Sequence, residues 1–241
     1  MRKYPVKICV VLPVLKKKIF EEMTYKELEA ARRKDVKITV VSVERGPASI
    51  ESAYDEEIAA PWILEKIEEA EEKGFDAAII DCMGDPALEA AREMVSIPVI
   101  GPCQASMAIA STLCDKFSVV TVLKRLLPLF WSKARKYGFE SKVASVRSVE
   151  VPVLELDEKR SEVKVKLLAE SKKAIEEDEA GAIILGCTGM IGMAKELQEA
   201  LGVPVIDPAV ASMKLAESLV DMKISHSKLV YPKPPKKERR L

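Results

Sequence analysis

Histidine is almost absent from this chain of 241 residues, and so are several other signals that would point to a function. The single histidine is His226, and no two cysteines have the CxxC spacing, so we expect no metal site. The 38 basic residues are balanced by 38 acidic residues, which leaves no long-range field to attract phosphate backbones. Nucleic acid is therefore not an expected partner.

Long apolar runs are absent too. No segment approaches the roughly 18 uninterrupted apolar residues of a membrane helix, and the start of the chain lacks a small-residue cleavage site. The five cysteines are an odd number, which fits reduced thiols in a cytoplasm better than a disulfide framework. We expect a cytoplasmic protein that does not enter a membrane, with a mainly aliphatic core because only 5% of the residues are aromatic.

What the chain does contain is an internal repeat. An apolar run ends in a cysteine and a glycine twice, with Cys82 and Cys187 standing 105 positions apart. The matching segments are Ala77-Ala-Ile-Ile-Asp-Cys-Met-Gly-Asp85 and Ala182-Ile-Ile-Leu-Gly-Cys-Thr-Gly-Met190, Ile97-Pro-Val-Ile-Gly-Pro102 and Val203-Pro-Val-Ile-Asp-Pro208, and Ala105-Ser-Met107 and Ala211-Ser-Met213. Self-similarity on this scale indicates two related structural units.

Apolar runs alternate along the chain with charged stretches of helical period. The predicted strands are 6–12, 36–43, 77–81, 97–100, 117–122, 143–146, 182–185 and 203–206. The predicted helices are 21–34, 55–73, 86–95, 124–137, 158–178, 190–201 and 209–222. This alternation is typical of βαβ units, so we predict an α/β fold of two pseudo-symmetric lobes, each a mostly parallel sheet flanked by helices.

The repeat also predicts where the lobes divide. We assign residues 1–104 and 209–229 to the first α/β lobe and residues 105–208 to the second. Helix 209–222 then packs back on the first lobe. Residues 230–241 combine proline with a basic run and are predicted to form a mobile tail.

The repeated cysteines carry the chemistry that the pattern predicts. Each follows a buried strand, and ligands of open α/β sheets gather at the carboxyl ends of strands. Gly84 and Gly189 allow a tight turn that directs backbone N–H groups inward, and a helix that begins after each cysteine would lower the thiol pKa below its usual ~8.5. If the lobes face each other, Cys82 and Cys187 lie on opposite sides of one cleft.

Two thiols on opposite faces of one carbon suit a racemase without a cofactor. One thiolate removes a proton, the other thiol returns a proton from behind, and backbone N–H groups stabilise the enolate-like intermediate. The structural alternative is that both cysteines are small apolar residues that end strands. The repetition of the Cys-x-Gly turn favours the catalytic interpretation.

Other polar residues near these turns have two interpretations each. Asp85 either polarises a substrate amide or caps the helix begun by Pro86, and the cap is favoured. Thr121, at a strand end, is open between a ligand contact and a turn.

These motifs resemble the Asp/Glu/hydantoin racemase superfamily, and its hydantoin racemase branch in particular. The resemblance rests on Gly186-Cys-Thr-Gly-Met190, on the turn Cys82-x-Gly-Asp-Pro86, and on Gly46-Pro-Ala-Ser-Ile-Glu51 followed by Tyr54-Asp55-Glu56. It implies two α/β lobes around one active site, no cofactor, a homo-oligomer, and Cys82 with Cys187 as the acid/base pair. It further implies that backbone groups at four residues hold the substrate's carboxylate or ring carbonyl, namely Met83, Gly84, Thr188 and Gly189, and that Ser49 is a contact.

Three departures from the family pattern concern the substrate. The usual Asn-Pro-Asn after the first strand is Leu12-Pro13-Val14 here, which removes two amides and makes the pocket wall more apolar. A usual Thr-Thr is Thr121-Val122, and the Thr-His of glutamate racemases is Thr188-Gly189. The leading hypothesis is racemisation of a 5-substituted hydantoin. The alternatives are an aspartate-type racemase, an isomerase of a small diacid, and a two-lobed sensor of small anions without catalysis.

Overall fold

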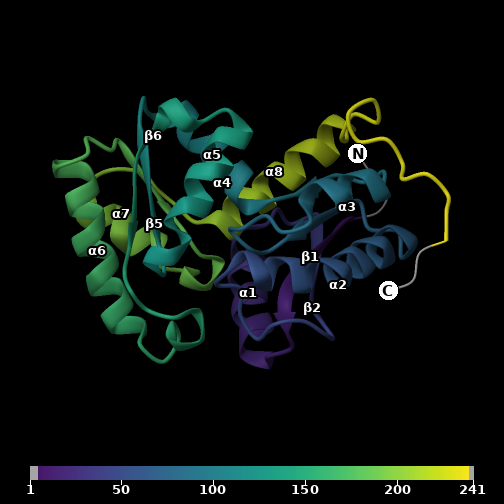
Figure 1. Cartoon of the computed structure of the whole chain (residues 1–241), viewed down its shortest axis with the longest axis horizontal. Coiled ribbons are helices and arrows are strands. Elements are labelled where there is room, and N and C mark those ends of the chain that lie inside the picture. Colours follow the sequence, from purple (N-terminus) through teal and green to yellow (C-terminus); the bar gives the residue numbers. More distant parts are fainter. Residues whose placement is uncertain (1–4, 239–241) are drawn as a thin grey trace.

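The structure is a computed structural model that describes residues 5–238, and it consists of two α/β lobes placed side by side (Figure 1). Each lobe holds a four-stranded parallel sheet, with strand order β2-β1-β3-β4 in the first and β6-β5-β7-β8 in the second. The strands are β1 (Val6–Leu15), β2 (Val36–Val43), β3 (Ala77–Ile80), β4 (Val99–Ile100), β5 (Phe117–Thr121), β6 (Val143–Ser148), β7 (Ala182–Leu185) and β8 (Val205–Ile206). Both lobes follow the same order, which confirms the predicted fold class.

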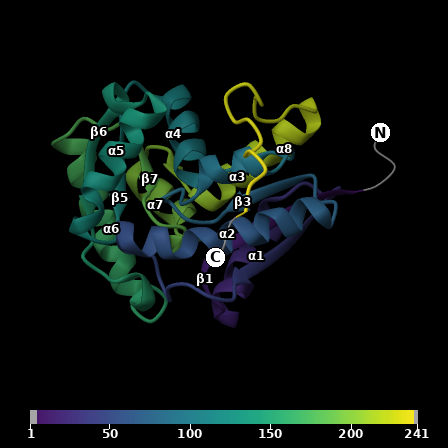
Figure 2. The ribbon, with the colours of Figure 1, turned by 45° about the vertical axis from the view of Figure 1, so that its right-hand side comes forward.

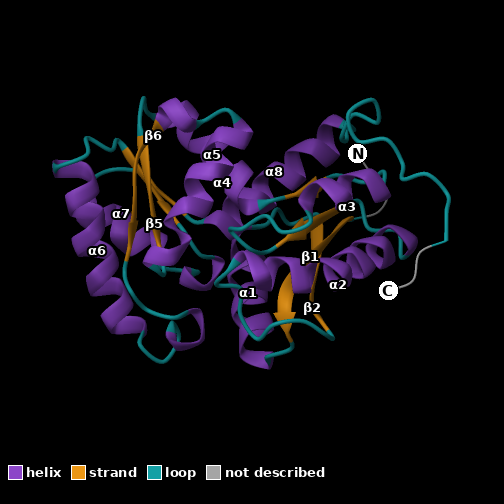
Figure 3. Ribbon diagram, in the orientation of Figure 1, coloured by secondary structure: helices purple, strands orange, loops and turns teal. Residues whose placement is uncertain are grey.

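Helices cover both sheets (Figure 3). They are α1 (Lys18–Ala31), α2 (Ala53–Glu72), α3 (Leu88–Met94), α4 (Pro102–Leu113), α5 (Leu127–Tyr137), α6 (Arg160–Glu176), α7 (Ala194–Leu201) and α8 (Pro208–Met222). Short 3-10 turns lie at η1 (Lys124–Leu126), η2 (Glu140–Lys142), η3 (Val153–Glu155) and η4 (Thr188–Met190). Among the residues that the structure describes, no helix is both long and apolar enough to cross a membrane.

The two cysteine-bearing strands lie inside their sheets because their residues are apolar on both faces. All four residues of β3 and all four of β7 are buried, as parallel strands covered by helices on both sides require. In the first sheet, Val11 of β1 pairs with Ile80 of β3. In the second, Val120 of β5 pairs with Leu185 of β7. The carboxyl ends of the central strands are thereby aligned, and the residues that follow them meet at one edge of each sheet.

Helix α4 was not predicted from the sequence. It is rich in small residues and lacks charge, so no amphipathic period marked it. Its sequence Ala105-Ser-Met107 matches Ala211-Ser-Met213 of α8, and the two helices pack against each other between the lobes. Helix α8 also packs on β3, β4 and α1. The chain therefore crosses between the lobes twice.

The segment after α8 folds back over the edge of the first sheet (Figure 2). The Lys228 ammonium donates to the carbonyls of Arg92, Glu93 and Val95, which end α3. The His226 ring bonds to the backbone of Val99 on the edge strand β4. The ring of Tyr231 meets His226 edge-on, with 6.0 Å between the centroids, and the mobility of the tail at residues 230–241 stays a prediction. The last part of that tail, 239–241, lies outside the described residues.

Candidate active site

A cavity of about 110 Å³ lies where the carboxyl ends of both central strands meet. Its wall comes from both lobes: the end of β1, helix α1, the loop after β2, the turns after β3 and β7, and the segment from Val122 to Phe130. An apolar cavity of about 150 Å³ holds benzene, and this cavity is of the same order of size. This is the position at which open α/β sheets bind ligands.

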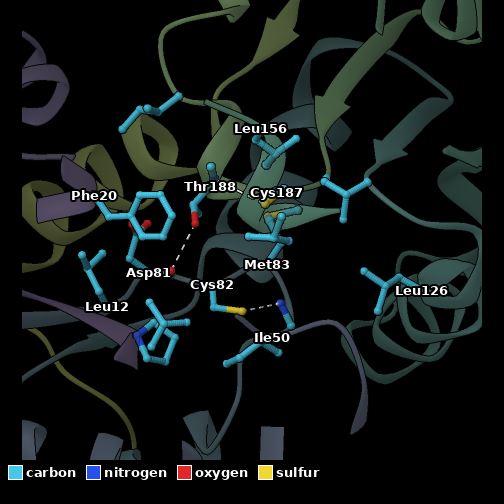
Figure 4. Close-up of a pocket in the computed structure, with 18 of the residues that line it drawn as sticks. Leu12, Phe20, Ile50, Asp81, Cys82, Met83, Leu126, Leu156, Cys187 and Thr188 are labelled. Atoms are coloured by element: carbon cyan, nitrogen blue, oxygen red, sulfur yellow. Dashed lines mark hydrogen bonds between the residues drawn. The ribbon is translucent and has the colours of Figure 1, made fainter. Parts of the chain in front are cut away.

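Each of the two cysteine turns contains the same hydrogen bond, from a glycine N–H to the cysteine sulfur two residues earlier. After β3, the Gly84 N–H donates to the Cys82 Sγ over 3.5 Å. After β7, the Gly189 N–H donates to the Cys187 Sγ over 3.3 Å. Both side chains line the one cavity (Figure 4), and the fold thereby brings together two residues that are 105 positions apart in the sequence.

The expectation of a lowered thiol pKa is wrong. Burial raises the pKa of Cys187 to about 12 and that of Cys82 well above its usual value, despite the opposing Gly N–H bonds. Neighbouring acidic groups raise both pKa values further: Glu56 acts on Cys82 and Asp81 on Cys187. The physical reason is burial, which disfavours the charged thiolate and outweighs the Gly N–H bonds, including the one at the start of η4 directly after Cys187.

The other predicted site residues divide into two groups. Four line the cavity beside the thiols, namely Met83, Gly84, Thr188 and Gly189. Three do not line it, namely Ser49, Thr121 and Asp85, although Ala48 and Ile50 on either side of Ser49 do. The Thr121 hydroxyl is fully buried and donates to the Gly186 carbonyl over 3.1 Å, which ties β5 to the second cysteine turn.

One hydrogen bond joins the two cysteine turns directly. The Thr188 hydroxyl donates to the Asp81 carbonyl over 3.1 Å (Figure 4). A second contact between the lobes closes the rim, where the Val153 N–H donates to the Glu51 carboxylate over 2.6 Å. These bonds hold the halves of the cavity in a fixed relation.

Comparison with known proteins identifies the family to which this chain belongs. The family model for Asp/Glu/hydantoin racemases matches residues 20–216. The chain belongs to this family. The predicted superfamily is thereby confirmed, and with it an enzyme of the racemase class.

Relatives of this family member resemble it over nearly their whole length. A hydantoin racemase from Pseudomonas sp. (strain NS671) is 45% identical over 212 residues, which cover 87% of this chain and 85% of the relative. The solved allantoin racemase from Klebsiella pneumoniae has a TM-score of 0.92 at 37% identity, covering 96% of this chain and 95% of that one. The allantoin racemase from Pseudomonas fluorescens has a TM-score of 0.93 at 30% identity, covering 98% and 100%.

In this member of the family, Asp85 serves the fold. Its carboxylate is 3% exposed and accepts from the Cys103 and Gln104 N–H groups, both over 3.0 Å, and from the Tyr137 hydroxyl over 2.7 Å. The first two bonds cap the N-terminus of α4, and the third ties α5 to the first lobe. The favoured interpretation as a cap therefore describes its hydrogen bonds, but the capped helix is α4 rather than one begun by Pro86.

Replacement of Asp85 by asparagine is expected to lower the free energy of unfolding by about 1–3 kcal/mol, because one amide nitrogen would face donors that need an acceptor. The melting temperature should fall by about 3–10 °C. Thermal unfolding measures the effect, with Tyr137→Phe as a matched control that removes one donor and loses less. An unchanged melting temperature together with a raised KM would instead make Asp85 a substrate contact.

Two carboxyl groups that the sequence analysis did not select line the cavity. The Asp81 Oδ1 and the Glu56 Oε1 are both buried and have no hydrogen-bond partner among the described residues. Glu56 lies against Gly84, where an added Cβ would overlap its Oε1, and burial raises the pKa of its carboxyl. The sequence contained a signal for each of these residues, because Asp81 directly precedes Cys82 and Glu56 ends the motif Tyr54-Asp55-Glu56.

The side chains that could bring charge to the cavity are acidic. Within residues 5–238, its ionisable lining residues besides the thiols are the carboxyl groups of Glu56, Asp81 and Asp157, and no lysine or arginine lines it. Its other walls are mostly apolar, with Leu12, Phe20, Leu126, Leu129, Phe130 and Leu156 among them. Among the described residues, no group of three or more His, Cys, Asp or Glu side chains is arranged to hold a metal ion.

Proposed function

We propose that this enzyme racemises 5-substituted hydantoins by proton transfer between Cys82 and Cys187. The observation that carries the proposal is the pair of Cys-x-Gly turns, one from each lobe, with both thiols on the wall of a single cavity. Membership of the racemase family supports the reaction class. The relatives named for hydantoin and allantoin, which are both five-membered rings with an acidic carbon next to a carbonyl, support the substrate class.

The reaction needs one thiolate and one thiol. The thiolate on one face takes the proton of the ring carbon and becomes a thiol. The thiol on the other face gives its proton to that carbon and becomes a thiolate. Charge is conserved, and the enzyme emerges with the two protonation states exchanged, ready for the opposite enantiomer. The backbone N–H groups of Gly84 and Gly189, which donate to the sulfurs, stabilise whichever thiolate is present.

The raised thiol pKa values suit this task. A thiolate in a dry cavity is a stronger base than one in water, and its basicity comes closer to that of the carbanion it must generate. Burial is the largest cause of the raised pKa of both Cys82 and Cys187. The same burial makes the resting thiolate rare, so forming it contributes to the barrier.

The acidic lining of the cavity favours an uncharged ring over aspartate or a small diacid as the substrate. Aspartate and small diacids carry one or two carboxylates, which need a cation or several donors when they leave water. Among the described residues no lysine or arginine lines this cavity, and its ionisable lining groups other than the thiols are all carboxyls. A neutral hydantoin does not need a cation there, and its substituent can lie against Phe20 and Leu126. Apolar substituents at the ring carbon are therefore preferred.

Incubation with a panel of chiral hydantoins and amino acids in D₂O tests this function. We expect deuterium at the stereogenic carbon of hydantoins with alkyl or benzyl substituents, together with loss of optical rotation, and none in aspartate. Mass spectrometry and polarimetry read the two effects. A hydantoin that binds without exchange would leave a non-catalytic sensor as the better account, and exchange confined to aspartate would reverse the substrate assignment.

The remaining expectations from the sequence stay predictions. They are the homo-oligomeric state, the cytoplasmic location, and the division into residues 1–104 with 209–229 and residues 105–208. Direct contacts of Ser49, Thr121 and Asp85 with the substrate also stay untested, and the cavity lining gives them less support than Met83, Gly84, Thr188 and Gly189.

A further inference from the structure

Asp81 is a buried carboxyl group that the two-thiol reaction does not use. It follows β3 directly, its N–H donates to the Val11 carbonyl over 2.8 Å, and its carbonyl accepts from the Thr188 hydroxyl. The backbone is thus held from both sides of the cavity. Its side chain is 5% exposed and lines the cavity.

The Asp81 Oδ1 atom has no hydrogen-bond partner among the described residues. A buried carboxylate without partners is strongly unfavourable, whereas a protonated carboxyl needs far less solvation. Asp85, four residues later and equally buried, shows the contrast, because three donors satisfy its carboxylate. Asp85 is therefore built for the fold, and Asp81 is left with hydrogen-bonding capacity that nothing in the fold uses.

A second carboxyl, that of Asp207, acts on Asp81. Asp207 accepts from the N–H groups of Gly192, Ala209 and Val210, which partly offset the burial that raises its pKa to about 6. The Asp81 Oδ1 has no donor among the described residues, and burial first and Asp207 second raise the pKa of Asp81 to about 7. The other titratable groups around it are Cys187, whose pKa is raised, and the cavity carboxyls Glu56 and Asp157; Glu27 of α1 acts on Asp207. Among the described residues that line the cavity there is no lysine or arginine.

The repeat shows that this carboxyl is present on one side only. The residue that matches Asp81 in the second repeat is Gly186, which directly precedes Cys187. A Cβ at Gly186 would lie 2.6 Å from the Cα of Thr121, so that side has no room for a side chain. The two thiols are therefore alike while their surroundings differ, and a ring with unlike edges can lie in the cavity in one preferred orientation.

We propose that Asp81 is a specificity-determining residue, which as a neutral carboxyl donates a hydrogen bond to a carbonyl oxygen of an uncharged ring substrate. Its proton stays on the carboxyl throughout, and the thiols alone move protons to and from carbon. When Asp81 ionises, the donor is lost and the cavity gains another negative charge, which disfavours an enolate-like state and any anionic substrate. This role rests on the proposed racemisation of hydantoins.

The pH dependence of racemisation of 5-benzylhydantoin tests the role. In the wild-type enzyme we expect KM to rise about tenfold per pH unit above about pH 7, as the protonated fraction of Asp81 falls, whereas the growing thiolate fraction acts on kcat. In Asp81→Asn, the amide still donates but does not titrate, so KM is raised about threefold at pH 6 and stays flat to pH 8.5. In Asp81→Leu, which cannot donate, KM rises about tenfold at every pH. Asp85→Asn is the matched control. In this variant KM should still rise above about pH 7, while the free energy of unfolding falls.

The proposal would be overturned if the KM of Asp81→Asn still rose above about pH 7, or if Asp81→Leu had the wild-type KM. Infrared difference spectroscopy gives a readout that does not depend on turnover. The wild-type minus Asp81→Asn spectrum should contain a protonated carboxyl band at pH 6 that disappears around pH 7–8. Absence of that band at pH 6 would reject the neutral carboxyl. If the band is present and no hydantoin exchanges deuterium, the proposed function fails while the protonated state of Asp81 stands.

Discussion

Replacing either Cys82 or Cys187 by serine is expected to abolish racemisation, with a loss of at least about 10³-fold in kcat. A serine hydroxyl is too weak an acid to return the proton, and its alkoxide is too rare to remove one. Both thiols line the same cavity, and each is paired with its own Gly N–H, so neither can replace the other. Optical rotation of a single hydantoin enantiomer, followed over time, measures the loss.

The two serine variants should differ in what remains. Each keeps one thiol that can still exchange the proton of the enantiomer whose hydrogen points toward it. Residual deuterium uptake should therefore favour one enantiomer in Cys82→Ser and the opposite enantiomer in Cys187→Ser.

A cysteine outside the cavity gives the control for these variants. Cys114 is partly buried and does not line the cavity, so Cys114→Ser should racemise at the wild-type rate. Full two-way racemisation by either cavity variant would mean that one base serves both faces. Full activity in both would remove the catalytic interpretation of the repeat altogether.

Gly186→Ala is expected to have the largest effect of any single methyl group added to the active-site turns. The new Cβ would lie 2.6 Å from both the Cα and the Cβ of Thr121, so β5 and β7 would have to separate. Overpacking of this kind lowers the free energy of unfolding by about 1–3 kcal/mol. Because Cys187 follows directly, a shift of about 1 Å in its sulfur would also reduce kcat by about 10²-fold.

A glycine two residues beyond Cys187 provides the comparison. In Gly189→Ala the added methyl meets the end of the Leu156 side chain at 2.9 Å, and that side chain can move. The melting temperature of Gly186→Ala should therefore fall by about 3–10 °C, and that of Gly189→Ala by clearly less. Equal melting temperatures for the two variants would show that β5 and β7 have space that the packing here does not indicate.

The repeat in the sequence was enough to predict most of the architecture. Buried runs such as 77–81 and 182–185 predicted β3 and β7, and their shared Cys-x-Gly ending predicted that both thiols meet at one site. Helix α4 escaped because its residues are small and uncharged, and small residues give no amphipathic signal. Its match to α8 through the Ala-Ser-Met segments was the available clue, because the corresponding helix at 209–222 was predicted.

The parts of the site that the sequence did not reveal depend on burial. Whether Glu56 faces solvent or the cavity depends on how α2 packs against Gly84, which no local pattern encodes. The thiol pKa was predicted with the wrong sign because the burial of each thiol, which is the largest cause of its raised pKa, cannot be read from the local sequence. Asp81 was overlooked because an aspartate at a strand end is ordinary in sequence, and only its missing hydrogen-bond partner distinguishes it.

The identical strand order of the two lobes has a consequence for how such a site can change. A half-length chain that paired with a copy of itself about a twofold axis would also present two thiols to one cavity, but every alteration would appear on both sides at once. Two covalently joined halves are free of that constraint. One side holds Asp81 while the other holds a glycine pressed against Thr121, so a symmetric proton-transfer pair is combined with an asymmetric binding surface. A single chain with two unlike halves can therefore bind the two edges of a substrate ring differently, whereas a symmetric dimer of half-length chains could not.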